Sequence, residues 1–189
     1  MTFNFTSASL LGLLFAITSV AADDKPEKGY EFKIEQIKPQ PAMTIRFRVA
    51  DSSEISAKYG EAFGQLVGHI ASEGGQIAGA PFGRYHSFTK DGIEIEAGIP
   101  VAKIVEEKGN IKPTELPGGN AITTIHMGGY KELGNAHNAM QRWVKEQGHK
   151  TTGGPWEYYL TDPGQEPDSS KWRTKLIQLI ANKGKGQAE

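Results

Sequence analysis

A glutamate set among aromatic residues, Glu157 in the run WEYY, is the residue of this chain best suited to chemistry. If this run is a strand, Glu157 and Tyr159 share one face, and Trp156 and Tyr158 share the other. A carboxylate beside aromatic rings suits a hydrophobic cation, because the rings add cation–π contacts of about 0.5–2 kcal/mol each. The same carboxylate could act as a general acid or base, with Tyr159 as its catalytic partner.

The chain contains an internal duplication that includes this glutamate. Residues 59–85 and 133–159 align without an insertion, at a constant offset of 74 positions. The identical pairs are Gly60 and Gly134, Ala62 and Ala136, Gly74 and Gly148, Gly79 and Gly153, Pro81 and Pro155, and Tyr85 and Tyr159. We expect two copies of one structural unit, related by a pseudo-two-fold axis, with a pocket at their junction.

The two copies differ at one telling position, where the first has Gly83 and the second has Glu157. Around a two-fold axis, the equivalent strands bring Glu157 together with Tyr159 and Tyr85. Gly83 is then expected to leave space for a ligand. The alternatives are a solvated strand glutamate and tyrosines that only pack in the core.

Further aromatic and histidine side chains are expected either in the core or at the pocket. Trp156 and Phe82 point away from Glu157 in this arrangement, and we expect both to pack on the helix side as core. Tyr130 follows a strand end, where it lines either the pocket rim or the start of a helix. His126 ends the same strand, where it orients a ligand or is a hydrogen-bonded structural histidine.

Sequence signals for other chemistry are weak. His69, His137 and His149 show no spacing typical of a metal site. The run GGYKELG lacks the spacing of a nucleotide-binding fingerprint. We therefore expect no metal and no cofactor.

Length and composition set limits on the class of protein. The chain has 189 residues, which suits one ordinary domain, and its net charge of −1 gives no reason to expect a nucleic-acid partner. The absence of cysteine excludes disulfides, thiolate metal sites and a cysteine nucleophile.

The N-terminal segment resembles a secretion signal. Residues 1–22 carry no charged side chain, and an apolar run at 10–17 is followed by small residues. This pattern predicts a signal peptide cleaved before Asp23, hence a periplasmic or secreted protein that is not inserted in a membrane. An uncleaved N-terminal membrane anchor is the alternative. We expect a flexible lead-in at 23–30 and a polar tail at 182–189.

Hydrophobic periodicity predicts a β-α-β-β unit twice, in repeat one at 31–101 and repeat two at 121–180. In repeat one we expect strands at 31–37 and 43–49, interrupted by Pro39 and Pro41, a helix from a cap at Asp51 to Gly74, and strands at 76–88 and 93–101. In repeat two we expect a strand at 121–126, a helix at 131–147, and a strand at 156–161. The segment 172–180 fits a strand or a helix, and the duplication favours a strand.

The expected fold class is therefore α+β, an antiparallel sheet with two helices on one face. A stripe of glycines along the first helix, Gly60, Gly64 and Gly68, suggests that another segment packs closely there.

The ordered motifs of repeat two resemble the GyrI-like, or effector-binding, domain family found in AraC-type regulators. They are the run from His126 to Tyr130, then Trp143, then the run from Glu157 to Tyr159, and the resemblance extends over residues 31–181. It implies a pseudo-symmetric pair of βαββ units around a small-molecule pocket. The chain shows no attached DNA-binding module, so a transcriptional role is not implied.

The resemblance leads to three functional hypotheses. The first is an exported protein that binds hydrophobic, aromatic, possibly cationic small molecules through Glu157, Tyr159, Tyr85, Tyr130, His126 and Gly83. The second is a hydrolase of reactive small molecules that uses Glu157 and Tyr159. The third is haem binding, by similarity to the SOUL fold, with His86 as the candidate ligand. The oligomeric state is left open.

Overall fold

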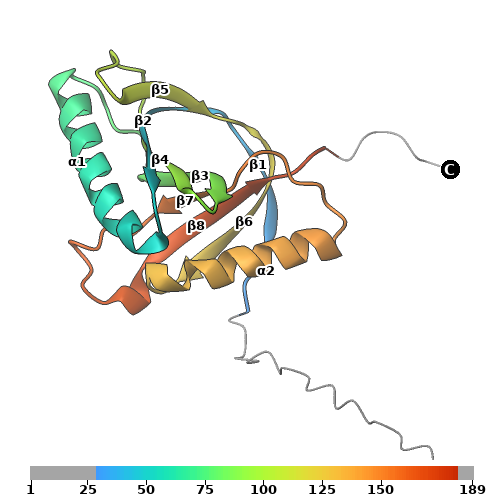
Figure 1. Ribbon diagram of the computed structural model, residues 1–189. Coiled ribbons are helices and arrows are strands. Elements are labelled where there is room, and N and C mark those ends of the chain that lie inside the picture. The colour runs from blue at the N-terminus through green and yellow to red at the C-terminus, as the bar shows by residue number, and fades with distance from the viewer. Residues whose placement is uncertain (1–28, 183–189) are drawn as a thin grey trace, which may run out of the picture.

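The computed structural model describes residues 29–182, which form one antiparallel sheet with two helices (Figure 1). The expected signal peptide, most of the lead-in and nearly all of the polar tail lie outside these residues. The strands are β1 (Lys33–Ile37), β2 (Gln40–Val49), β3 (Phe82–Thr89), β4 (Gly92–Pro100), β5 (Ile111–Leu116), β6 (Gly119–Met127), β7 (Trp156–Tyr159) and β8 (Arg173–Leu179), and the helices are α1 (Ile55–Ser72) and α2 (Leu133–Glu146).

The strand order shows the duplication directly. The sheet runs β1-β6-β8-β7-β3-β4-β2-β5, and all its pairs are antiparallel. The units β2-α1-β3-β4 and β6-α2-β7-β8 occupy equivalent halves and meet where β3 pairs with β7. This confirms the predicted α+β fold with two β-α-β-β units.

The strand that precedes each unit along the chain pairs with the other unit. β1 leads into β2 along the chain but pairs with β6, and β5 leads into β6 but pairs with β2. Consecutive strands thus lie at opposite ends of the sheet, which curls so that the chain can cross between them (Figure 1). The periodicity did not predict β5 as a strand.

The ends of both helices follow from local sequence. The Asp51 carboxylate accepts a hydrogen bond of 2.7 Å from the Ser53 amide in the turn before α1. Gly74, with φ of 67°, follows α1, and Gly148, with φ of 66°, follows α2. A positive φ strains most other residues, so these equivalent glycines end the helices at equivalent places.

The apolar stripes of both helices pack on the same face of the sheet. They consist of Tyr59, Ala62, Leu66 and Ile70 in α1 and Leu133, Ala136, Met140 and Val144 in α2. Figure 1 shows the two helices over this face, with β3 and β7 between them. A separate apolar cluster, which includes Phe82, Trp156 and Leu116, fills the inside of the curl on the opposite face.

Several local expectations differ from the structure. A Cβ atom built on Gly60, Gly64 or Gly68 would meet nothing within 4 Å, so the expected close packing on this stripe is wrong. Pro41 continues strand β2 opposite Glu115 of β5, and its carbonyl accepts a hydrogen bond from the Val101 amide just beyond the end of β4. The strand expected from residue 76 begins at Phe82. The segment near 172–180 is strand β8, as the duplication suggested.

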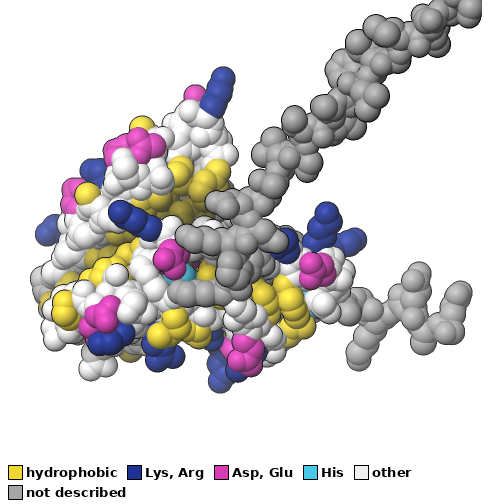
Figure 2. Space-filling model, turned by 90° about the horizontal axis from the view of Figure 1, so that it is seen from below, with side chains coloured by type: hydrophobic (Ala, Val, Ile, Leu, Met, Phe, Trp, Pro, Cys, Tyr) yellow, Lys and Arg dark blue, Asp and Glu magenta, His cyan; other side chains and the backbone are white. Residues whose placement is uncertain are grey.

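The described surface mixes both signs of charge. On the face shown in Figure 2, lysine and arginine side chains are interspersed with acidic ones around hydrophobic patches. Over residues 29–182, no helix is long and apolar enough to cross a bilayer.

Candidate functional site

Strand β7 directs alternate side chains to the two faces of the sheet. Glu157 and Tyr159 point to the helix face, while Trp156 and Tyr158 point into the curl. The expectation that Trp156 and Phe82 pack on the helix side is therefore wrong, although both are buried core residues. The reason is the curl, which creates a second apolar core that local periodicity does not reveal.

Glu157 is a buried carboxylate with two side-chain partners. Only 1% of its surface is exposed. The Nε2 atom of His137, on α2, lies 2.5 Å from its Oε1 atom, and the Tyr159 hydroxyl donates a hydrogen bond of 2.9 Å to its Oε2 atom. A carboxylate removed from water must be compensated in this way, because an unpaired buried charge is very costly.

The duplication places Gly83 directly opposite Glu157 in the β3–β7 pairing. A Cβ atom on Gly83 would collide with the Tyr59 hydroxyl and lie 2.7 Å from the Tyr159 hydroxyl. The space that Gly83 leaves, expected to hold a ligand, is occupied here by Tyr59 from α1 and by Tyr159. In this conformation the site is closed by its own aromatic side chains.

Four rings form an edge-to-face cluster beside Glu157. The Tyr159 ring centroid lies 5.6 Å from that of Tyr59, 6.1 Å from that of Phe63 and 5.3 Å from that of Tyr130. Tyr130 is held in turn by Trp172, at 4.8 Å between centroids. We call Tyr59, Phe63, Tyr130 and Tyr159 the aromatic cluster.

Tyr85 reaches the same region from β3. Its ring lies edge-on to His137, with 6.1 Å between centroids, and stacks on Phe88 at 5.3 Å. It thus borders the partner of Glu157, whereas its equivalent in the second repeat, Tyr159, bonds Glu157 itself.

Burial and the nearby carboxylate keep the tyrosines neutral. Burial raises the pKa of Tyr85 and Tyr159 well above the usual value near 10, and the negative charge of Glu157 raises both further. Burial likewise raises the pKa of Tyr59. The hydroxyl protons are therefore retained at physiological pH, and that of Tyr159 is donated to the carboxylate.

His126 lies apart from this group. It is fully buried in β6, two strands from β7, and its Nδ1 atom lies 3.0 Å from the Tyr30 hydroxyl. It shares the helix face with Tyr159 through the register with Thr174. The structure thus places Glu157, Tyr159, Tyr85, Tyr130 and Gly83 together, and His126 beside Tyr30.

The residues near His86 do not fit a haem. Its Nε2 atom lies 2.9 Å from Oε2 of the buried Glu96 and 3.3 Å from Arg46, so the nitrogen that would bind iron is engaged. The described residues contain no group of three or more histidine or acidic side chains arranged to hold a metal ion.

His137 is the site residue that spacing alone did not identify. Its equivalent in the first repeat is Phe63, at the same offset that relates Gly83 to Glu157. The pair Phe63 and Gly83 in one copy thus becomes His137 and Glu157 in the other. Replacement of an aromatic residue of the first helix by a histidine at the equivalent position of the second is the signal that could have found His137.

Taken together, the fold and the buried carboxylate define a duplicated α+β domain with an aromatic, acidic site at the junction of its halves. Residues 30–180 match the family model described as the GyrI-like small molecule binding domain, and the chain belongs to this family. No curated protein matches the chain.

Two solved structures of EcmrR, one of them a complex with DNA, contain a domain of the same fold. The C-terminal domain of EcmrR is 24% identical, with a TM-score of 0.68 over 81% of this chain and 98% of that chain. In the EcmrR–DNA complex the TM-score is 0.72 at 23% identity, and the match spans 58% of the EcmrR chain and 81% of this one.

Two further solved structures share the fold at lower sequence identity. SAV2435, bound to tetraphenylphosphonium, has a TM-score of 0.56 at 11% identity over 80% of this chain and 94% of its own. A hydrolase from Listeria innocua has a TM-score of 0.59 at 13% identity over 80% of this chain and 92% of its own. At these identities the likeness concerns the fold alone.

Proposed function

We propose that this protein binds hydrophobic aromatic cations, with Glu157 as the counter-charge and the aromatic cluster as the wall of the site. The observation that carries the proposal is a carboxylate with 1% exposure, surrounded by tyrosine rings and paired with the His137 imidazole. A bound cation would take over the charge compensation that His137 supplies in the closed site. The ring faces would add cation–π attraction.

The closed geometry requires that binding opens the site. Tyr59 and Phe63 both come from α1, and their rings stack at 5.3 Å with an interplanar angle of 5°. A small movement of this helix, or rotation of these two side chains, uncovers the carboxylate. The tetraphenylphosphonium complex of a structure with the same fold supports the choice of ligand class.

Calorimetric titration of the full-length chain with tetraphenylphosphonium tests the proposal. Glu157→Gln keeps the shape of the side chain but removes its charge. We expect the affinity to fall by roughly 30-fold or more, since losing one partner of a buried charge pair costs about 2–5 kcal/mol.

The chain offers a matched control for this variant. Glu96 is also buried, at 4% exposure, and also pairs with a histidine, His86, but it faces the inside of the curl. Glu96→Gln should leave the tetraphenylphosphonium affinity within about twofold. Equal affinities of the wild type and Glu157→Gln would contradict the proposal.

A hydrolase is the second candidate, because a glutamate that bonds a histidine is also an arrangement that activates water. Glu157 would orient His137 as the general base, and the Tyr159 hydroxyl would polarise the leaving group. In that case Glu157→Gln abolishes turnover while ligand affinity survives. Release of nitrophenol from p-nitrophenyl acetate, compared between the wild type and this variant, provides the measurement.

We further propose that the protein is exported and that its mature form begins near Asp23. The support is the uncharged apolar segment at residues 1–22, followed by small residues and then a charged stretch. Intact-mass analysis of protein from the extracytoplasmic fraction tests this. A chain that retains residues 1–22 would favour the membrane anchor.

A further inference from the structure

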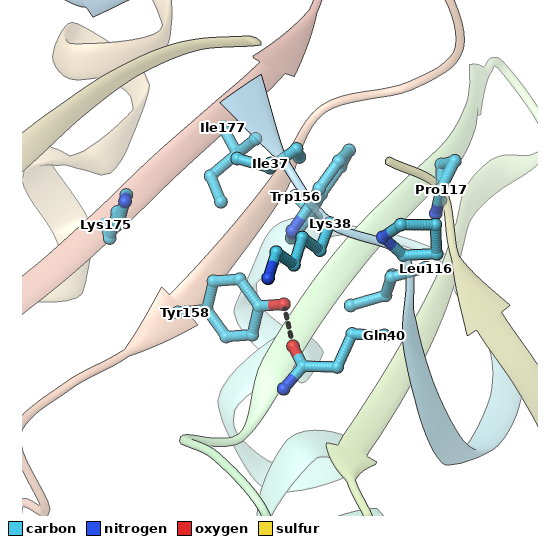
Figure 3. A pocket seen from close by; sticks show the side chains of 10 residues that line it. Ile37, Lys38, Gln40, Leu116, Pro117, Trp156, Tyr158, Lys175 and Ile177 are labelled. Atoms are coloured by element: carbon cyan, nitrogen blue, oxygen red, sulfur yellow. Dashed lines mark hydrogen bonds between the residues drawn. The ribbon is translucent and has the colours of Figure 1, made fainter. Parts of the chain in front are cut away.

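The inside of the curled sheet contains a cavity that is separate from the Glu157 site. It has a volume of about 360 Å³, within the range of roughly 300–1,000 Å³ that is usual for small-molecule pockets. It opens where the chain crosses between β1 and β2 and between β5 and β6 (Figure 3). Trp156 and Tyr158 form its floor, so the four residues of β7 serve two sites on opposite faces of the sheet.

At the floor of the cavity lies a buried donor without an acceptor; its nitrogen is covered, so a ligand reaches it only when the surrounding side chains move. Trp156 is 1% exposed, and its indole N–H makes no hydrogen bond within the described chain. Tyr158 is the other side chain of β7 that lines the cavity, and burial raises the pKa of its hydroxyl. That hydroxyl itself donates a hydrogen bond of 2.7 Å to Oε1 of Gln40. A buried donor left without a partner costs about 1–3 kcal/mol, so an acceptor from a ligand would stabilise the protein.

The charges at the cavity favour an anion. Two lysines line it, and no acidic side chain does. Lys175 is already compensated, because its Nζ atom lies 2.9 Å from Oε2 of Glu35. Lys38 forms no ion pair with any residue in the range 29–182, and Figure 3 shows its ammonium group on the same side as the Trp156 nitrogen and the Tyr158 hydroxyl.

The rest of the lining is apolar. It consists of Ile37, Pro39, Leu116, Pro117 and Ile177, with the ring of Trp156 beneath them. Such walls suit a flat or branched hydrocarbon body. The equivalent of Trp156 in the first repeat is Phe82, which has no donor, so the polar feature is specific to this side of the duplicated sheet.

We propose that this cavity is a second binding site, for a small apolar carboxylate. Its head group accepts a hydrogen bond from the Trp156 indole and pairs with Lys38, and its body lies against the prolines and aliphatic side chains. The site is independent of Glu157, which lies on the opposite face of β7.

The probe for this site is 2-naphthoate, compared with the neutral 2-naphthamide of the same shape. Nuclear magnetic resonance of the full-length chain, labelled with nitrogen-15, resolves the three tryptophan indole N–H groups, and a Trp156→Phe variant assigns the one of interest. We expect 2-naphthoate to shift the Trp156 indole resonance downfield in a saturable way, with little change at Trp143 and Trp172. The amide should bind more weakly.

Two further variants distinguish binding at this site from nonspecific binding elsewhere on the protein. Lys38→Gln should weaken 2-naphthoate by about fivefold, the scale of one partly exposed charge contact, whereas Lys33→Gln on the neighbouring strand should not. Glu157→Gln should leave 2-naphthoate binding unchanged. The proposal is overturned if the Trp156 resonance does not move, if the amide binds as well as the carboxylate, or if Lys38→Gln and Lys33→Gln behave alike.

Discussion

The His137 imidazole on α2 meets the buried Glu157 carboxylate on β7, with 2.5 Å between Nε2 and Oε1. His137 is 21% exposed and Glu157 is 1% exposed, so the pair connects the interior to solvent through the histidine. The contact with His137 compensates the carboxylate buried between the two halves. In the first repeat, the equivalent positions hold Phe63 and Gly83. It also makes His137 the residue that a cationic ligand must replace.

Replacing His137 with the residue of the other repeat tests its role. His137→Phe leaves Glu157 with the Tyr159 hydroxyl and no charge partner, and we expect the free energy of unfolding to fall by about 3 kcal/mol. In the double variant His137→Phe, Glu157→Gln the buried charge is gone, so much of this loss should be recovered. Urea denaturation of the wild type, the single variants His137→Phe and Glu157→Gln, and the double variant gives the coupling energy. A coupling near zero would mean that the pair contributes nothing to stability.

Gly83 is predicted to be intolerant of any side chain. A Cβ atom there would collide with the Tyr59 hydroxyl, and the backbone of paired strands cannot easily yield. Gly83→Ala should therefore lower the free energy of unfolding by about 1–3 kcal/mol. Gly60→Ala is the control, because its Cβ meets nothing within 4 Å in a helix, and it should raise stability by up to about 1 kcal/mol. If urea denaturation gave the same free energy of unfolding for both variants, the conclusion that Tyr59 fills the space beside Gly83 would be wrong.

The buried tyrosines predict a loss of stability at alkaline pH. Burial raises the pKa of Tyr59, Tyr85 and Tyr159 in the folded state, with Glu157 adding to the rise. Below about pH 10, the usual tyrosine value, both states are protonated and this contribution is fully present. Above it the unfolded chain loses these protons first, so the free energy of unfolding falls as pH rises.

An absorbance titration of tyrosinate, run beside urea denaturation at about pH 8 and pH 11, measures this effect. The last tyrosines should ionise only as the fold is lost. Full ionisation of all six tyrosines near pH 10 in a folded protein would show that the cluster is open to solvent.

The closed aromatic cluster predicts slow ligand entry. Association of tetraphenylphosphonium should be slower than the usual range for an open site, because the rings over Glu157 must move first. Phe63→Ala removes the ring that stacks on Tyr59 and should increase the association rate. Val67→Ala, on the same helix at 45% exposure, should not. Stopped-flow tyrosine fluorescence measures both rates, and identical rates would show that Phe63 does not gate the site.

Much of this architecture can be predicted from the sequence, because the duplication presents each local sequence pattern twice. The spacing of apolar residues predicts both helices, and equivalent glycines end them. The equivalence of Gly83 and Glu157 follows from the offset, whereas their direct pairing across β3 and β7 is a finding of the structure. Local periodicity suffices here, since a helix stripe and a turn glycine depend on near neighbours in sequence.

The tertiary structure decided which face of the sheet each strand presents. The exchange of β1 and β5 between the units curls the sheet and creates an interior for Trp156 and Phe82, so these residues pack away from the helices. It also placed Tyr59 over Gly83 and His137 against Glu157. Such contacts join side chains from a helix and a strand that lie many residues apart, and no local pattern encodes the distance between them. The sequence thus determined both helices, most of the strands and the presence of Glu157 in only one repeat, whereas packing of the two halves determined what surrounds this carboxylate.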